Sequence, residues 1–355
     1  MEEIWTIQKA LKWTQGYLGR KGDPQPRLSA EWLLSEATGH SRVELYMCFD
    51  EPLSPDERQL LRGFVSRRGT GEPLQYISGR APFRYINVKV APGVLIPRPE
   101  TEVLVSEALA LLPPAPRRVA FDSTIDAWEG DVLRAASMLA EQDVECVADN
   151  AAREEAAAQS VAAAPSDPSA TASASVSDKP ARPLLVADIC TGSGCVACAI
   201  AIERPDTRLF ATDISPVAVK LARENAADLD VSDRGRIEQG DLGQPLPAGA
   251  MGRLDLVVSN PPYVPTSVLA EIPAEVADFE PSLALDGGAD GNDVLRRLLP
   301  WSLQALKSGG AIAVELHETR LDAACDLARE AGFTDVGFKC DLSGKPRVLI
   351  GRKPV

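Results

Sequence analysis

Apolar residues recur at helical spacing over the first 72 positions, in stretches separated by short polar breaks. This pattern predicts a small helical domain at residues 1–72. Its apolar positions are Ile4, Leu11, Leu18, Ala30, Leu33, Leu34, Ala37, Leu60, Leu61, Phe64 and Val65. Residues 73–97 change to extended, partly alternating segments that begin at Tyr76 and Ile77 and are broken by prolines and glycine, which predicts a β-hairpin linker.

The segment after the linker predicts one helix at 100–112, and then the periodicity is lost. Residues 113–182 contain Pro113-Pro114-Ala115-Pro116, an Ala/Glu-rich middle and a long run of Ala, Ser, Asp and Pro. Such a composition buries too little apolar surface to offset the entropy of ordering the chain. We expect a mostly disordered insertion at about 113–182, with a short helix near 132–139, inside a larger domain at 98–355.

From Leu184 onward, short apolar runs alternate with helical patterns. Strands are predicted at 184–189, 208–212, 236–239, 254–259 and 311–315, and helices at 195–203, 215–228, 291–306 and 319–331. That order predicts an α/β fold with a parallel sheet covered by helices on both faces. A last pair at 334–338 and 347–351 has no helix between its members, so it predicts an antiparallel terminal hairpin. Ligands of such sheets bind beyond the carboxyl ends of the strands.

Composition narrows the class of protein. The chain has 355 residues, 45% of them hydrophobic, and contains no stretch of about 20 apolar residues that would span a membrane. The start Met1-Glu2-Glu3 lacks the basic and apolar regions of a secretory signal, so a cytoplasmic protein is expected. The net charge of −14 argues against direct nucleic-acid binding and favours a protein or small-molecule substrate, although it could equally serve solubility.

Seven cysteines without a secretory signal indicate free thiols. Cys190, Cys195 and Cys198 have the spacing of iron–sulfur ligands, with Cys325 or Cys340 as a conceivable fourth. We favour no metal site, because the same stretch reads as a tight turn followed by a helix on which small cysteines pack against a sheet.

The turn after the first strand of the sheet carries Gly192-x-Gly194-x-x-Ala197, which lets the backbone approach a ligand closely. The next strand ends in Asp213, where a carboxylate can accept hydrogen bonds from both hydroxyls of a ribose. These features support a nucleoside ligand without choosing between NAD and S-adenosylmethionine, and Asp213 could also serve as a helix N-terminal acid. Asp241 and Leu242, after the third strand, could hold an adenine or form a solvated turn.

The fourth strand runs into Asn260-Pro261-Pro262-Tyr263. An amide nitrogen is a poor nucleophile, and two acceptors for its N–H groups would hold its lone pair toward a methyl donor. The Asn260 side-chain oxygen is one acceptor, and the prolines, which cannot continue a helix, hold the Pro261 carbonyl toward the pocket as the other. Tyr263 can stack on the planar group. A rigid turn is the alternative interpretation, but a hydride-transfer enzyme has no need for this loop.

These motifs together resemble the release-factor glutamine methyltransferase family known as HemK or PrmC. The resemblance lies in the segments 73–77, 95–102, 188–194, 259–263, 280–281 and 286–291. It implies a class I S-adenosylmethionine-dependent methyltransferase fold with a Rossmann-like, mostly parallel seven-stranded sheet, preceded by an N-terminal helical domain that docks the substrate protein. It also implies methylation of the N5 nitrogen of the glutamine in the Gly-Gly-Gln motif of class-one peptide chain release factors.

The same resemblance assigns site residues. It implies that S-adenosyl-L-methionine is bound by Cys190, Thr191, Gly192, Ser193, Gly194, Asp213, Leu242 and Asn260, and that catalysis and substrate binding fall to Asn260, Pro261, Pro262 and Tyr263. Arg98 and Glu100 receive no role beyond a structural ion pair.

Two features depart from the family pattern. Cys190 stands where glycine is more usual, so its side chain could crowd the cofactor, and the insertion is additional. Because the insertion precedes the first strand of the sheet, we expect activity to survive its deletion. Three alternatives stay open: a ribosomal-protein glutamine as acceptor, an adenine amine as acceptor, and a non-catalytic nucleoside-binding module.

Overall fold

The computed structural model describes residues 4–115 and 182–355. Met1–Pro113 and Arg182–Val355 form one compact unit, to which the following description refers. The helix expected near 132–139 lies outside the described residues. Among the described helices, none has both the length and the hydropathy of a membrane span.

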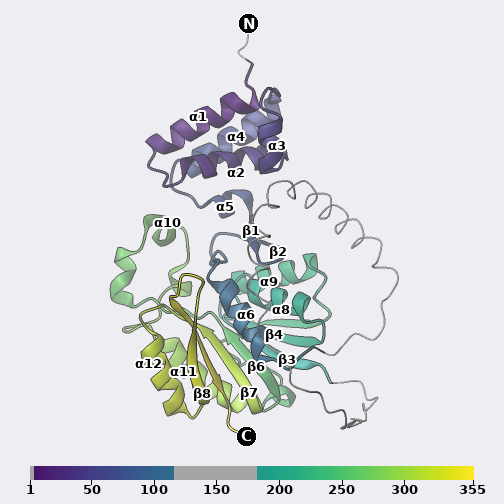
Figure 1. Cartoon of the computed structure of the whole chain (residues 1–355), viewed down its shortest axis with the longest axis vertical. Coiled ribbons are helices and arrows are strands. Elements are labelled where there is room, and N and C mark those ends of the chain that lie inside the picture. Colours follow the sequence, from purple (N-terminus) through teal and green to yellow (C-terminus); the bar gives the residue numbers. More distant parts are fainter. Residues whose placement is uncertain (1–3, 116–181) are drawn as a thin grey trace, which may run out of the picture. The chain divides into compact units, whose positions relative to one another are not determined.

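The N-terminal segment folds into helices with an apolar core of their own. The helices are α1 (Ile7–Arg20), α2 (Pro26–Thr38), α3 (Arg42–Met47) and α4 (Pro55–Arg68), drawn in purple in Figure 1. Two of them begin at capping boxes, in which Ser41 and Ser54 each exchange hydrogen bonds with a glutamate three residues on. Leu18, Leu33 and Leu34 are completely buried between the helices, as the helical spacing predicts.

A short helix and a hairpin follow. Helix α5 (Leu74–Ser78) ends at Gly79 with a positive φ of 73°, and strands β1 (Arg80–Phe83) and β2 (Ile86–Lys89) then pair antiparallel. The prediction of an extended conformation for Tyr76 and Ile77 was wrong. Both side chains are buried on one helical turn that Gly79 closes, and a single turn is too short to show a helical period in sequence.

The second region is a seven-stranded sheet with strand order β5-β4-β3-β6-β7-β9-β8. Strands β3 to β7 are parallel, and β9 pairs antiparallel with both β7 and β8, which confirms the predicted fold class and its terminal hairpin. The strands are β3 (Leu184–Ile189), β4 (Thr207–Asp213), β5 (Gly235–Gln239), β6 (Leu254–Ser259), β7 (Leu306–Glu315), β8 (Thr334–Cys340) and β9 (Pro346–Arg352).

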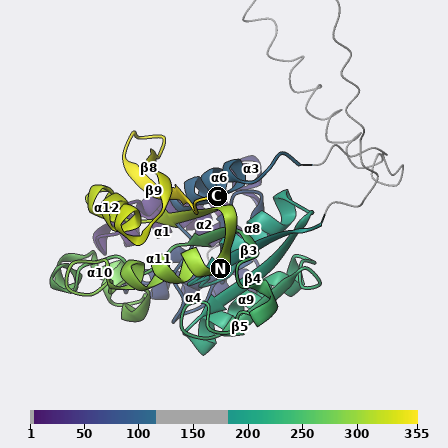
Figure 2. The same cartoon turned by 90° about the horizontal axis from the view of Figure 1, so that it is seen from below.

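Helices cover both faces of this sheet, as Figures 1 and 2 show. Alternate strand residues belong to different cores, so that Val186 packs with α6 (Thr101–Leu111), α8 (Cys195–Glu203) and α9 (Pro216–Asp228), whereas Ala187 packs with α11 (Asp293–Ala305) and α12 (Leu321–Ala331). Because both faces are covered, the central strand β6 is buried along its whole length. The remaining short elements are η3 (Ala248–Ala250), η4 (Thr266–Glu271), α10 (Ala274–Ala277) and η5 (Ser282–Ala284).

Candidate functional site

A cavity lies at the carboxyl ends of β3, β4 and β6. This is the edge at which parallel sheets of this kind bind their ligands. Some of the residues that line the cavity were predicted from the sequence as site residues, and others were not. The selected ones are Cys190, Thr191, Gly192, Ser193, Asp213, Asn260 and Pro262, and the others come mainly from 93–98 and 281–284.

The turn after β3 depends on left-handed backbone. Gly192 and Gly194 have φ angles of 57° and 79°, which glycine adopts without strain. A Cβ on Gly194 would lie 3.0 Å from the Cβ of Ala222 on α9, so this position also lets α8 and α9 approach each other. Cys195 and Val196, the first two residues of α8, line the cavity.

Cys190 adopts a left-handed backbone conformation in the same turn although it is not a glycine. Its φ of 61° is unusual for a residue with a side chain and explains why glycine is the more natural choice there. Burial raises the pKa of the Cys190 thiol well above its ordinary value, and it raises the pKa values of Cys195 and Cys198 to about 12. Thiols held protonated in this way are poor metal ligands.

Asp213 organises the turn from the neighbouring strand. Its two carboxylate oxygens accept backbone hydrogen bonds from Gly192 and Ser215, each at 2.9 Å. Burial raises the pKa of Asp213, although these hydrogen bonds oppose the shift. A carboxylate oxygen has two lone pairs, so each can still accept a ligand hydroxyl.

Asp188 is a cavity residue that the sequence analysis did not select. It is almost fully buried near the end of β3, where it accepts hydrogen bonds from the Thr191 hydroxyl at 2.6 Å and the Ala197 N–H at 3.1 Å. Burial raises its pKa to about 7. The signal was present in the sequence, because an acidic residue within a buried apolar strand needs partners.

Gly194, Leu242, Pro261 and Tyr263, which were also predicted as site residues, lie outside the cavity lining. Leu242 has a positive φ of 48° and packs partly against the core beneath the sheet, and the adjacent Asp241 forms an ion pair with Arg297. Their predicted contacts with ligands stay predictions.

The loop that contains Tyr263 packs against a glycine-rich segment at residues 286–291. Gly287 N–H donates to the Val264 carbonyl at 2.8 Å. A Cβ on Gly287 would lie 2.7 Å from the Tyr263 Cα, and one on Gly291 would lie 2.4 Å from the Tyr263 carbonyl oxygen. Only glycine permits such close backbone packing, which gives a physical reason for the Gly-rich sequence at 286–291.

Asn260 directly follows the last residue of β6 and lines the cavity. The hydroxyl of the preceding residue, Ser259, donates to the Ile189 carbonyl at 2.6 Å and ties β6 to β3. The Asn260 side-chain Nδ2 donates to the Thr101 hydroxyl at 3.2 Å. The amide oxygen of Asn260 is therefore directed away from Thr101 and is available to a ligand.

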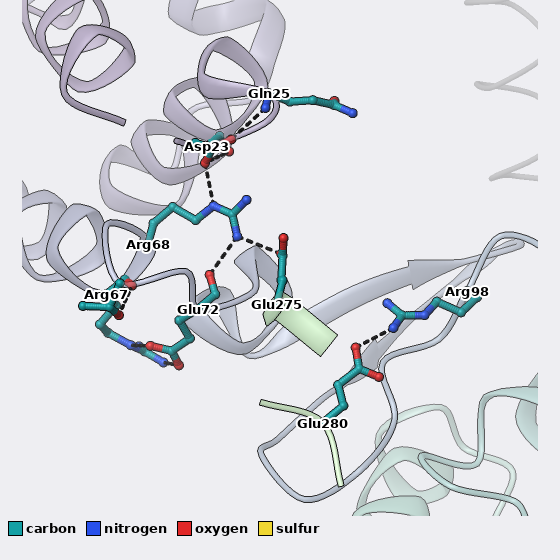
Figure 3. A network of polar contacts seen from close by, with 10 residues as sticks. Asp23, Gln25, Arg67, Arg68, Glu72, Arg98, Glu275 and Glu280 are labelled. Carbon is teal, nitrogen blue, oxygen red and sulfur yellow. Dashed lines mark hydrogen bonds and ion pairs between the residues drawn. The ribbon is translucent and has the colours of Figure 1, made fainter. Parts of the chain in front are cut away.

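Two ion pairs attach the segment between Tyr263 and Leu285 to other parts of the fold (Figure 3). Arg98 lines the cavity and pairs with the buried Glu280, which confirms an ion pair for Arg98. Five residues earlier, Glu275 pairs with Arg68 of α4 at 2.8 Å. The segment between Tyr263 and Leu285 is thus attached both to the cavity and to the helical region.

Comparison with known proteins agrees with this geometry. A family model described as the PrmC N-terminal domain matches residues 9–79, and one described as a methyltransferase small domain matches residues 172–272. Together with the sheet order and the cavity, these matches define a class I S-adenosylmethionine-dependent methyltransferase.

The relatives identify the family. A release factor glutamine methyltransferase of Geobacter sulfurreducens is 37% identical, with 99% of this chain and 98% of the relative covered. One from Rhodopirellula baltica is 33% identical, with 98% and 97% covered. A solved methyltransferase structure from Pyrococcus furiosus covers 49% of this chain and 76% of its own, at 19% identity and a TM-score of 0.38. The chain belongs to the release factor glutamine methyltransferase family.

The residues present fit S-adenosylmethionine. Gly192 leaves room for close backbone approach, the half-buried Asp213 offers acceptors for ribose hydroxyls, and the cavity extends from them to Asn260. The cofactor would supply an electrophilic methyl group on a sulfonium.

Proposed function

We propose that the protein methylates the N5 nitrogen of the glutamine in the Gly-Gly-Gln motif of class-one peptide chain release factors. The observation that carries this proposal is that Asn260 and Pro262 line the same cavity as Gly192 and Asp213, with the Asn260 amide nitrogen engaged by Thr101. This geometry supports the Asn260 oxygen as an acceptor beside the proposed cofactor site. Release factors act in translation, so we propose the cytoplasm as the compartment.

The residues of the Asn-Pro-Pro-Tyr loop act by positioning. Asn260 Oδ1 and the Pro261 carbonyl accept the two hydrogens of the glutamine amide and direct its lone pair toward the methyl group, while Tyr263 packs on the flat face. In the step itself the N–C bond forms as the S–C bond breaks, and the extra proton then leaves to water. Orientation of this kind can contribute several kcal/mol to lowering the barrier, so no strong base is required.

The acidic net charge of −14 supports a protein acceptor over a nucleic acid. The test incubates the full chain with radiolabelled S-adenosylmethionine and, separately, a purified release factor, the same factor with the motif glutamine replaced by alanine, ribosomal proteins, and bulk RNA. We expect label in the intact release factor alone. Label in RNA or ribosomal protein would overturn the substrate, and cofactor binding without any transfer would overturn the activity.

Asn260→Ala should reduce transfer by about 100-fold or more, because it removes an acceptor that the reacting nitrogen needs. Cofactor affinity, measured by calorimetry, should change by less than about tenfold. Asn87→Ala on the exposed face of β2 is the matched control and should leave both quantities unchanged.

A further inference from the structure

The orientation of the Asn260 side-chain amide decides whether this residue favours or opposes binding of a substrate amide. Its oxygen can accept a hydrogen from a substrate amide, whereas its NH₂ group would oppose the substrate N–H groups donor to donor. In the structure Nδ2 donates to Thr101 Oγ1 at 3.2 Å. A Thr hydroxyl can accept or donate, however, so Thr101 alone does not enforce this direction.

Thr101 is placed to connect two elements of the site. It is the first residue of α6, is 2% exposed, and lines the cavity. Its hydroxyl accepts a hydrogen bond from Asn260 Nδ2, and a hydrogen bond from the same hydroxyl lowers the pKa of Glu315. A hydroxyl has a single hydrogen, so donation to Glu315 leaves only its lone pairs for Asn260.

Glu315 is the last residue of β7 and lies beside Asn260 through the sheet. Ser259, the last residue of β6, pairs with Val314 of β7, so Asn260 directly after β6 and Glu315 at the end of β7 are the next residues along two adjacent parallel strands. Glu315 is 2% exposed, and its Oε2 has no hydrogen-bond partner among the described residues. The proposed methyl-transfer mechanism assigns no role to this buried carboxyl group.

Ionised Glu315 can only accept hydrogen bonds. Burial, with a smaller contribution from Glu100, raises its pKa to about 7, and Thr101, Arg347 and Arg98 oppose this shift. Thr101, Arg347 and Arg98 favour the carboxylate form of Glu315, and in that form the Thr101 hydroxyl must be the donor.

We propose that Thr101 and Glu315 are positioning residues that act as one hydrogen-bonded chain and hold the Asn260 oxygen toward the cavity. The chain runs from Asn260 Nδ2–H to Thr101 Oγ1, and from the Thr101 hydroxyl to the Glu315 carboxylate. This inference rests on the proposed function, because the direction of the amide matters only when its oxygen receives the hydrogens of a substrate amide.

The test compares kcat, KM for release factor and the cofactor dissociation constant in four variants. Thr101→Val keeps the shape and removes the hydroxyl, Glu315→Met removes the acceptor with little change in size, and the double variant combines them. Thr101→Ser restores the hydroxyl. Thr14→Val is the matched control, since Thr14 is a fully buried threonine on α1 whose hydroxyl has no partner among the described residues.

We expect Thr101→Val and Glu315→Met each to lower kcat by about 10- to 100-fold, with cofactor affinity and thermal midpoint nearly unchanged, because a misdirected acceptor costs orientation rather than binding. The double variant should be no slower than the slower single variant, since both act through Asn260. Thr101→Ser should recover most of kcat, and Thr14→Val should match the native enzyme.

Native-like kcat in Thr101→Val, or multiplied losses in the double variant, would overturn the proposal. A loss confined to thermal midpoint or cofactor affinity would show a merely structural role and would overturn it as well. The proposed function fails separately, if the native enzyme does not label the release factor.

Discussion

Arg98 and Glu280 form an ion pair across 182 residues of sequence, and the side chain of Glu280 is only 1% exposed. Burial raises the pKa of Glu280, and Arg98 is the main group that opposes this shift. The pair joins the loop after the hairpin to the segment that follows the Asn-Pro-Pro-Tyr loop. Through Arg98, which lines the cavity, the pair ties this segment to the candidate site.

Arg98→Ala should lower the free energy of unfolding by roughly 1 to 3 kcal/mol at pH 8, because it leaves a buried carboxylate without its cation, while Arg98 itself is one-third exposed. The loss should be smaller at pH 5, where the raised pKa lets Glu280 take up a proton. Urea unfolding at both pH values measures this. The double variant Arg98→Ala/Glu280→Gln should recover part of the loss at pH 8, and a pH-independent loss would contradict the explanation.

Arg68 holds two carboxylates of different burial (Figure 3). Asp23 is 2% exposed and accepts from Arg68 at 2.7 Å, whereas Glu275 is 39% exposed. Arg68→Met should destabilise the protein by about 2 to 4 kcal/mol, because Asp23 is left buried without its partner. Glu275→Gln should cost less than about 1 kcal/mol.

Thermal and urea unfolding would check this difference, with the exposed Arg62→Met on the same helix as control. Equal losses in Arg68→Met and Glu275→Gln would show that the contact with Glu275, and not the buried Asp23, carries the stabilisation.

Asp188 should make the protein less stable as pH rises. Its pKa is raised by burial from 3.8 to about 7, so the folded state binds the proton more tightly than the unfolded state. The free energy of unfolding therefore falls between about pH 4 and pH 7, by up to about 1.4 kcal/mol per pH unit from this group. Asp188→Asn does not ionise, so its stability relative to the native protein should rise from pH 5 to pH 8.

Urea unfolding of both proteins over this range tests the sign, with the exposed Asp50→Asn as control. A relative stability of Asp188→Asn that is constant with pH, or that falls, would mean that Asp188 does not titrate in this window.

The two ends of the inserted segment are anchored to the fold. Arg204 donates to the Pro113 carbonyl at 3.0 Å, and Arg182 pairs with the buried Asp255. A variant in which a flexible Gly/Ser linker replaces residues 116–181, with both anchors kept, should retain kcat and cofactor affinity within about threefold, because every proposed site residue lies in the described segments. A large loss of kcat would assign the insertion a role in catalysis.

Local sequence patterns predicted most of the secondary structure and several residues of the candidate site. The alternation of apolar strands and helices predicted the sheet and its terminal hairpin, because hydrophobic periodicity follows directly from secondary structure. Gly192, Gly194 and Asn260 could be selected because their backbone freedom or amide chemistry is a property of the residue itself. The single turn of α5 was missed, since so short an element leaves no period to detect.

Sequence alone determined the alternation of strands and helices in the sheet region, the glycine turn and the choice of the Asn-Pro-Pro-Tyr loop as the candidate site. Only the tertiary structure decided that Arg98 meets Glu280, that Arg68 meets Asp23 and Glu275, and that Thr101 links Asn260 to Glu315. The physical reason is that a polar side chain carries no mark of its partner along the chain. Its partner is chosen when strands and helices distant in sequence pack together and leave each buried charge or hydroxyl to find whatever group lies within hydrogen-bond reach.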